Sequence, residues 1–349
     1  MYFPNRDAFW LAVGVAASVC LAVASHHFIE RPAGRVKATS RKVFVAAGLI
    51  SATFLSVGQF GVVLKGIPQR LPADAALALS AKKDVGAGQA DCTPHNWQLL
   101  GASEAKIRSN PCLLGDATQA ASFLLFGDSH SGALIAEFDA LARARGRTGL
   151  AIGYPSCAPI VTLRNKSTNH PHCDWLNETV LTFLHEHPEI STVVLAARWR
   201  TYADKYFYES PESDGGISFA DGLERTLAET SMLGRQVWVL GQVPSHPALV
   251  PETLAVDTML GRPPAQWAKR AVDHAKETEF VTRTFKELEE RGAARFLDLA
   301  SALCSEERCL VHRGGRPLYS DTNHLTNFGG FVLEGVLGDV LLNSQPPVK

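Results

Sequence analysis

Two long segments without a charged residue constrain this 349-residue chain more than any other feature. Residues 8–25 and residues 43–64 are rich in apolar side chains, and neither contains Asp, Glu, Lys or Arg. A helix of about 20 apolar residues is long enough to cross the roughly 30 Å hydrocarbon core of a bilayer. The sequence therefore predicts a transmembrane helical hairpin over residues 1–66, with helices at about 8–29 and 43–64.

The connection between the two segments predicts the orientation of the hairpin. Short basic loops remain on the cytoplasmic side of a membrane, so we expect the N-terminus and all residues after Leu64 to lie outside. A signal peptide carries its basic cluster before the apolar segment, whereas here it follows, which disfavours that alternative. A buried helical hairpin of a soluble protein stays open, because Gln59 and two histidines lie in or beside the segments. Residues 31–42 of this connection contain five basic residues and no acidic one, namely Arg31, Arg35, Lys37, Arg41 and Lys42.

Six of the seven cysteines follow Leu64, and the seventh, Cys20, lies inside the first apolar segment. An even number of cysteines in an exported domain is typical of disulfides. Six cysteines allow 15 pairings, but local spacing favours three pairs: Cys92–Cys112, Cys157–Cys173 and Cys304–Cys309. The alternative is a metal site around the "HPHC" at 170–173, which lacks the partner spacing of such sites. We therefore expect no metal.

Strand-like and helix-like segments alternate over residues 121–345, after a tether and lead-in at 67–120. Continuous apolar strands between amphipathic helices predict a parallel sheet covered on both faces, that is, a three-layer α/β/α sandwich. Ligands of such folds bind at the carboxyl ends of the strands. The net charge of −1 provides no overall field that would favour nucleic acid. The expected strands are 122–127, 148–153, 191–197, 236–243 and 294–299.

The first of these strands ends in "FGDSHS", which places Ser129 between a strand and the predicted start of a helix. A serine hydroxyl becomes a nucleophile when a neighbouring base takes its proton. Near the end of the chain, "DTNHL" puts Asp321 three residues before His324, where the carboxylate could hold the imidazole in one tautomer. Each motif alone also fits an ordinary helix cap. Together they predict a Ser129–His324–Asp321 catalytic triad.

These motifs resemble the SGNH hydrolase superfamily, in which a serine near the start of the domain pairs with a D-x-x-H near its end. More narrowly, "HHFIERP" at 26–32, the basic loop, one further membrane segment and "SCAP" at 156–159 resemble the C-terminal part of acyltransferase type 3 proteins with a fused SGNH domain. Those proteins O-acetylate bacterial surface polysaccharides such as O-antigen. They carry about ten membrane helices before this junction, so we expect an N-terminally truncated form or a half-enzyme.

The resemblance also predicts where the oxyanion of the reaction is bound. SGNH enzymes usually supply an asparagine and a glycine, but the segment after the third strand reads "AARWRTY" and contains no asparagine. Arg198 is the nearest substitute, Trp199 and Arg200 are alternatives, and Gly153 or the loop at Ser156 is expected to replace the glycine. Further candidates for lining the site are two neighbours of the nucleophile, Asp128 and His130.

The resulting hypothesis is an O-acyltransferase that acetylates a cell-surface polysaccharide through an acyl-serine intermediate on the outer side of the bacterial inner membrane. No cofactor is expected in the domain itself, because the acyl group, derived from acetyl-CoA, would come from a membrane-embedded partner or the missing N-terminal part. Two alternatives stay open. One is an esterase that deacetylates the same polymers, and the other is a non-catalytic polysaccharide-binding or assembly module.

Overall fold

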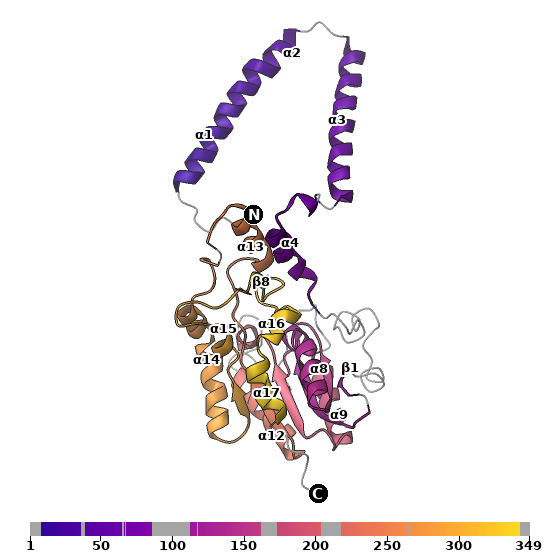
Figure 1. Cartoon of the computed structure of the whole chain (residues 1–349), viewed down its shortest axis with the longest axis vertical. Coiled ribbons are helices and arrows are strands. Elements are labelled where there is room, and N and C mark those ends of the chain that lie inside the picture. The colour runs from indigo at the N-terminus through magenta and orange to yellow at the C-terminus, as the bar shows by residue number, and fades with distance from the viewer. Residues whose placement is uncertain are drawn as a thin grey trace. The chain divides into compact units, whose positions relative to one another are not determined.

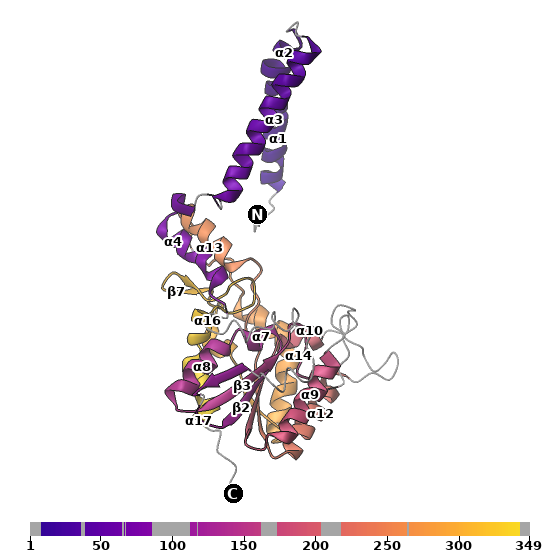
Figure 2. The same ribbon diagram turned by 90° about the vertical axis from the view of Figure 1, so that its right-hand side faces the viewer.

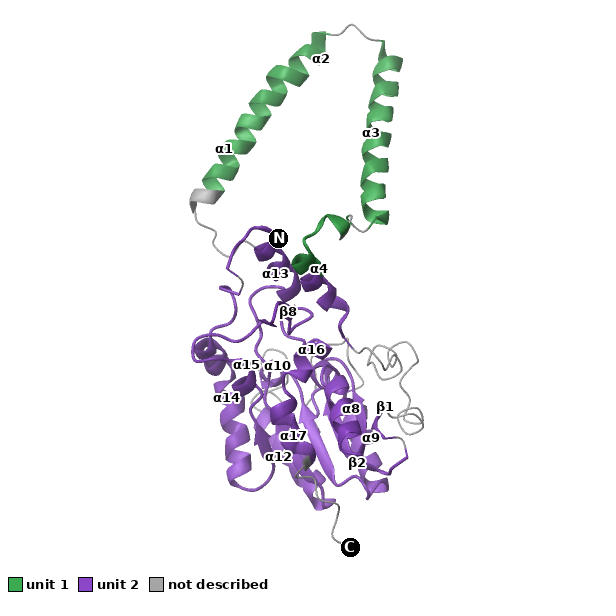
Figure 3. Cartoon of the chain, in the orientation of Figure 1, with its two compact units in different colours: residues 1–76 green, residues 77–349 purple. Residues whose placement is uncertain are grey.

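The structure, a computed structural model, describes residues 8–35, 39–64, 66, 68–85, 112–116, 118–161, 173–203, 218–263 and 265–342. The chain divides into two compact units, residues 1–76 and residues 77–349 (Figure 3). The first unit contains the apolar helices, and the second contains the sheet. Cys92 and most of the predicted lead-in lie outside the described residues.

The first unit contains two candidate membrane-spanning helices (Figure 1). Helices α1 (Ala8–Ser25), η1 (His26–Glu30) and α2 (Arg31–Arg35) follow one another directly, and α3 covers Ser40–Val63. The first helix therefore extends beyond its predicted end at 29, and α3 begins before residue 43. At 1.5 Å per residue, the 24 residues of α3 measure about 36 Å, enough to cross a bilayer. The apolar side chains of both helices are exposed, for instance Phe54 at 75%, whereas the core helix of a soluble protein would bury them.

The second unit is built on a six-stranded sheet with the strand order β1-β3-β2-β4-β5-β6. The five strands from β2 to β6 are parallel to one another, as the sequence predicts. The expectation of a wholly parallel sheet is wrong at one edge, because β1 runs antiparallel to β3. The strands are β1 (Cys112–Gly115), β2 (Ala121–Gly127), β3 (Thr148–Gly153), β4 (Thr192–Ala196), β5 (Gln236–Leu240) and β6 (Arg295–Leu297).

The short connection between β1 and β2 explains the direction of β1. A parallel crossover needs a dozen or more residues, but only residues 116–120 lie between these strands. The chain therefore enters the sheet antiparallel and turns into β2. Because β1 is four residues long, it shows no periodicity that would separate it from the predicted lead-in.

Helices cover both faces of the sheet, with α9, α12 and α14 on one side and α8 and α17 on the other (Figure 2). This arrangement confirms the predicted three-layer sandwich. A two-stranded sheet, β7 (His312–Arg313) with β8 (Arg316–Pro317), lies outside it. The helices after α3 are η2 (Pro68–Arg70), α4 (Ala73–Ser80), η3 (Ala81–Lys83), α7 (Ser129–Gly132), α8 (Ile135–Ala144), α9 (Cys173–Glu186), α10 (Trp199–Ala203), α12 (Phe219–Met232), α13 (Val250–Met259), α14 (Ala271–Glu290), α15 (Ala300–Leu303), α16 (Asn327–Phe331) and α17 (Glu334–Leu342).

Strand β2 shows why the sequence folds this way. Successive side chains of a strand point to opposite faces, so Leu124 and Phe126 join the core under α9, α12 and α14. Phe123, on the other face, packs against Phe138 of α8 with 6.0 Å between ring centroids. Both faces are buried, which explains the continuous apolar sequence. The strand is thereby held on both sides up to the point where Ser129 follows.

Helix α8 also carries a buried carboxyl group, Glu137. Its side chain is 2% exposed, and its Oε1 atom has no hydrogen-bond partner among the described residues. Burial and the nearby carboxylate of Glu334 raise the pKa of Glu137 to about 7, against the opposing charge of Arg145. An ordinary glutamate has a pKa near 4.5, so between these two values the folded state holds a proton that the unfolded state has lost.

The substitution Glu137→Gln is therefore expected to stabilise the protein at high pH only. As pH rises from 4.5 through 7, the wild-type protein loses stability relative to a variant with an uncharged side chain at position 137, on the order of 3 kcal/mol. Thermal unfolding of both proteins at pH 8 should show the gain, and at pH 4.5 it should vanish. The matched control is Glu306→Gln, at an exposed glutamate, which should change the stability equally little at both pH values. An equal effect of Glu137→Gln at both pH values would contradict the argument.

Candidate active site

The serine of the "FGDSHS" motif lies in a sharp strand-to-helix turn. Strand β2 ends at Gly127, and α7 begins at Ser129. A Cβ atom on Gly127 would lie 1.8 Å from the carbonyl oxygen of Ala196 in β4, so only glycine fits there. This close approach presents Ser129 at the carboxyl edge of the sheet.

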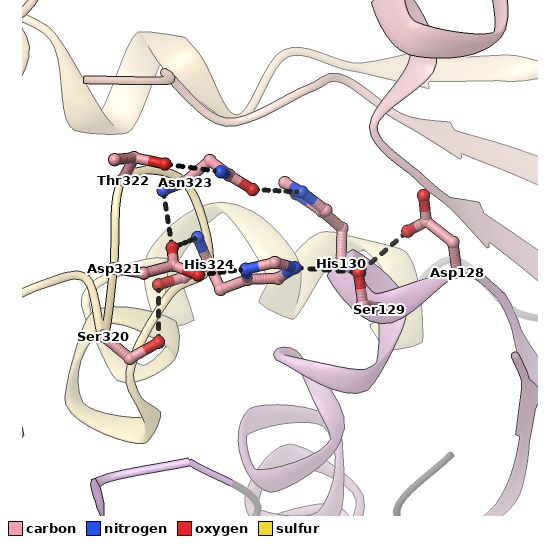
Figure 4. A network of polar contacts seen from close by, with 8 residues as sticks. All are labelled: Asp128, Ser129, His130, Ser320, Asp321, Thr322, Asn323 and His324. Atoms are coloured by element: carbon pink, nitrogen blue, oxygen red, sulfur yellow. Dashed lines mark hydrogen bonds and ion pairs between the residues drawn. The ribbon is translucent and has the colours of Figure 1, made fainter. Parts of the chain in front are cut away.

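Ser129, His324 and Asp321 form a continuous chain of hydrogen bonds (Figure 4). The Oγ atom of Ser129 lies 2.8 Å from Nε2 of His324, and Nδ1 of His324 lies 2.7 Å from Oδ2 of Asp321. The structure thus brings together two motifs separated by 195 residues. This geometry is the one that the predicted triad requires.

The ionisation of Asp321 decides which atoms donate. Burial would raise its pKa, but hydrogen bonds from the His324 side chain and from the backbone N–H groups of Asn323 and His324 hold it well below its ordinary value. Both backbone groups donate to Oδ1 at 2.8 Å. The carboxylate therefore accepts the Nδ1–H of His324, which leaves the lone pair of Nε2 facing the hydroxyl of Ser129. In this tautomer His324 can act as a general base.

The sequence made Asp128 a candidate for lining the site, but the structure buries its side chain. Its buried carboxylate accepts three hydrogen bonds, from the backbone N–H of His130 at 2.8 Å, the backbone N–H of Arg198 at 3.0 Å and the hydroxyl of Tyr202 at 2.6 Å. Both carboxylate oxygens are thus engaged inside the protein. Asp128 ties the turn of the nucleophile to the segment after β4, which the sequence pattern did not reveal.

The sequence also made Trp199 a candidate for the site, but the structure buries this side chain completely. Its Nε1–H donates to the carbonyl oxygen of Leu240 at 2.7 Å, and its ring lies edge-on against Phe285 with 5.2 Å between centroids. A tryptophan next to a strand end can line a site or fill a core, and here packing against Phe219 of α12 and Phe285 of α14 makes it part of the core.

The remaining candidates lie at the carboxyl edge of the sheet. Arg198 is partly exposed, and its guanidinium makes no hydrogen bond or ion pair with the described residues. A Cβ atom on Gly153 would lie 2.5 Å from the carbonyl oxygen of Gly127, so close packing of β3 on β2 requires glycine there. Ser156 is exposed in the turn after β3 and has a positive φ of 61°. A role of Arg198, Gly153 or Ser156 in oxyanion binding stays a prediction.

Two of the predicted disulfides are present. Cys157–Cys173 joins the turn after β3 to the start of α9, and Cys304–Cys309 closes a short loop after α15. The third predicted pair, Cys92–Cys112, includes a residue outside the described part of the chain. No group of three or more potential metal ligands occurs among the residues that the structure describes.

The sequence matches a known family over residues 91–337, described as "SGNH domain (fused to AT3 domains)". This chain belongs to that SGNH family. Its members are hydrolase- and acyltransferase-type enzymes, as the resemblance of "FGDSHS" and "DTNHL" implies. The match begins before the predicted domain start at 121 and includes the edge strand β1. No curated protein matches the chain.

Two solved structures are similar to this SGNH chain. The periplasmic domain of a lipopolysaccharide acetyltransferase from Salmonella ser. Paratyphi A has a TM-score of 0.51 and 16% sequence identity, covering 74% of this chain and 99% of that one. A candidate acylhydrolase from Bacteroides fragilis NCTC 9343 has a TM-score of 0.38 and 10% identity, covering 71% and 99%. At this level of identity, the first similarity supports the fold.

Proposed function

We propose that this protein is an O-acyltransferase that transfers an acetyl group to a hydroxyl of a bacterial cell-surface polysaccharide through an acyl-serine intermediate. The observation that carries the proposal is the hydrogen-bond chain from Ser129 through His324 to Asp321. A binding or assembly module would have no need of a hydroxyl aligned with a base and an orienting carboxylate.

The reaction would proceed in two balanced steps. In the first, Nε2 of His324 takes the proton of Ser129, whose Oγ attacks the acyl carbonyl of the donor, and the imidazolium returns this proton to the leaving group. In the second, His324 takes the proton of a sugar hydroxyl, which attacks the acyl-serine ester. The imidazolium then protonates Oγ of Ser129 as the product leaves. Asp321 stabilises the imidazolium in both steps, and Arg198 is our candidate donor to the oxyanion.

The family and the first unit support a membrane context for this reaction. The family is described as fused to AT3 domains, and the chain has two candidate membrane-spanning helices. We infer that a membrane-embedded module supplies the acyl group, derived from acetyl-CoA, and that the SGNH domain lies on the periplasmic side of the inner membrane. The similar Salmonella structure is a periplasmic domain of a lipopolysaccharide acetyltransferase, which supports a polysaccharide acceptor.

Hydrolysis is the second candidate, and solvent access favours it. The side chains of His324 and Asp321 are 32% and 39% exposed, so water can reach the base that would activate the acceptor. Water and a sugar hydroxyl would use the same residues. The predicted supply of a donor through the membrane favours transfer, because a hydrolase needs no such supply.

The acceptor can be tested on the full chain in detergent with p-nitrophenyl acetate as donor and an oligosaccharide as acceptor. Acyl transfer predicts acetyl-Ser129 in peptide mass spectra and O-acetylated sugar as product. Release of acetate with no acetylated sugar at any acceptor concentration would instead support the esterase. Absence of both acetyl-Ser129 and any Ser129-dependent turnover would overturn the proposed covalent route.

A further inference from the structure

A second side-chain bridge lies beside the one between Ser129 and His324. Nε2 of His130, the residue after the nucleophile, lies 3.0 Å from Oδ1 of Asn323, the residue before the base (Figure 4). The rings of His130 and His324 pack together with 4.9 Å between their centroids. The start of α7 and the loop at 320–325 are therefore joined by two adjacent bridges, of which the proposed chemistry uses one.

The direction of the second bridge follows from its neighbours. Nδ2 of Asn323 donates to Oγ1 of Thr322 at 2.8 Å, so Oδ1 is the atom that remains to accept a hydrogen bond. His130 must then carry a proton on Nε2 and act as the donor. Burial, together with the charges of His324 and Arg198, lowers the pKa of His130 to about 4, although Asp128 opposes this shift. His130 is thus neutral at physiological pH and adds no charge beside the imidazolium that forms on His324.

The loop at 320–325 is held on its other side by backbone bonds. The N–H of His246 donates to the carbonyl oxygen of Thr322 at 2.7 Å, and the N–H of Val250 donates to that of Asp321 at 3.1 Å. These two bonds attach the loop to the segment after β5, and neither of them joins the loop to α7. The side chain of His130, which is 7% exposed, extends from α7 to the loop and forms a hydrogen bond with Asn323.

We propose that His130 is a positioning residue, whose Nε2–H bond to Asn323 holds the 320–325 loop at the distance from α7 where His324 reaches Ser129. This role rests on the proposed function and goes beyond it, since His130 transfers no proton and touches no substrate. A shift of a base by about 1 Å can cost on the order of a hundredfold in rate. Loss of the bridge should therefore lower kcat with little effect on KM.

Two substitutions separate a hydrogen-bond role from simple packing. In His130→Phe the ring that packs on His324 is retained and the donor is lost, and Oδ1 of Asn323 is left unpaired. In His130→Gln the ring is lost, but an amide N–H with similar reach is retained. We expect His130→Phe to lower kcat about 10- to 100-fold, with KM within about twofold of wild type. His130→Gln should recover most of this loss, whereas a packing role predicts the opposite order.

The experiment measures Ser129-dependent turnover of p-nitrophenyl acetate by the full chain, with Ser129→Ala as baseline. The matched control is His185→Phe at the exposed end of α9, which should leave kcat unchanged. In the double variant His130→Phe/Asn323→Leu the loss should not exceed that of His130→Phe alone, because the two residues act as one unit. A kcat of His130→Phe within twofold of wild type, or a His130→Gln no better than His130→Phe, overturns the inference.

A second readout does not depend on catalysis. In the full chain labelled with ¹⁵N-histidine, the Nδ1–H of His324 should give a downfield proton resonance, because it donates to Asp321. His130→Phe should broaden or shift this resonance, and His130→Gln should retain it. Equal turnover by wild type and Ser129→Ala would overturn the proposed function, whereas an unchanged His324 resonance in His130→Phe would overturn the positioning role alone.

Discussion

Replacement of Ser129 by alanine is expected to lower acyl transfer by at least about a thousandfold while the fold is retained. The hydroxyl is the atom that would carry the acyl group, and neither His324 nor Asp321 can replace it as the nucleophile. Ser129 is partly exposed at the start of α7, so loss of one oxygen atom removes little packing. The measurement is the rate of O-acetyl sugar formation, together with acetylation of the Ser129 peptide.

The control for this variant is Ser301→Ala, an exposed serine of α15 whose hydroxyl donates to a local backbone carbonyl. This variant should keep wild-type activity. Thermal unfolding should show that Ser129→Ala is folded, with a Tm within a few degrees of wild type. Full activity of a folded Ser129→Ala would rule out the acyl-serine and require direct transfer from donor to acceptor.

The substitution Asp321→Asn is expected to lower kcat by about a thousandfold or more, for a reason that the hydrogen bonds specify. Two backbone N–H groups donate to Oδ1, so the amide oxygen of asparagine would occupy that position and its NH₂ group would face Nδ1 of His324. The imidazole must then accept at Nδ1 and carry its proton on Nε2. In that tautomer it cannot take the proton of Ser129.

The tautomer makes this prediction specific. Steady-state kinetics should show a large fall in kcat, and NMR of ¹⁵N-histidine-labelled protein should show the proton of His324 on Nε2 instead of Nδ1. Asp273→Asn, at a partly exposed aspartate in the first turn of α14, is the matched control. If Asp321→Asn kept kcat within about tenfold of wild type, Asp321 would hold the loop in place without orienting the base.

Much of the site follows from the sequence because two local motifs carry it. A serine after an apolar strand and a D-x-x-H before a helix each show in a few adjacent residues, and the alternation of strands and helices places both at one edge of a parallel sheet. The same locality explains the pairs Cys157–Cys173 and Cys304–Cys309, which join residues close in the chain. The apolar segments in the first 66 residues are equally local.

Contacts between distant segments decided the roles of the side chains around the predicted triad. Asp128 is a polar residue beside the nucleophile, and only Tyr202 and the backbone of Arg198, some 70 residues away, turn its carboxylate inward. Trp199 follows a strand end as a binding residue would, and its packing against α12 and α14 makes it part of the core.

The sequence by itself determined the alternation of the parallel strands β2 to β6 with helices, the two apolar segments and the three side chains of the predicted triad. Hydrophobic periodicity and short motifs carry this information because they are properties of neighbouring residues. The tertiary structure alone decided the direction of β1, the burial of Asp128 and Trp199, and the bond from His130 to Asn323, across 193 residues. Each of these depends on which surfaces meet when distant segments pack, and such contacts leave no periodic signal in a single chain.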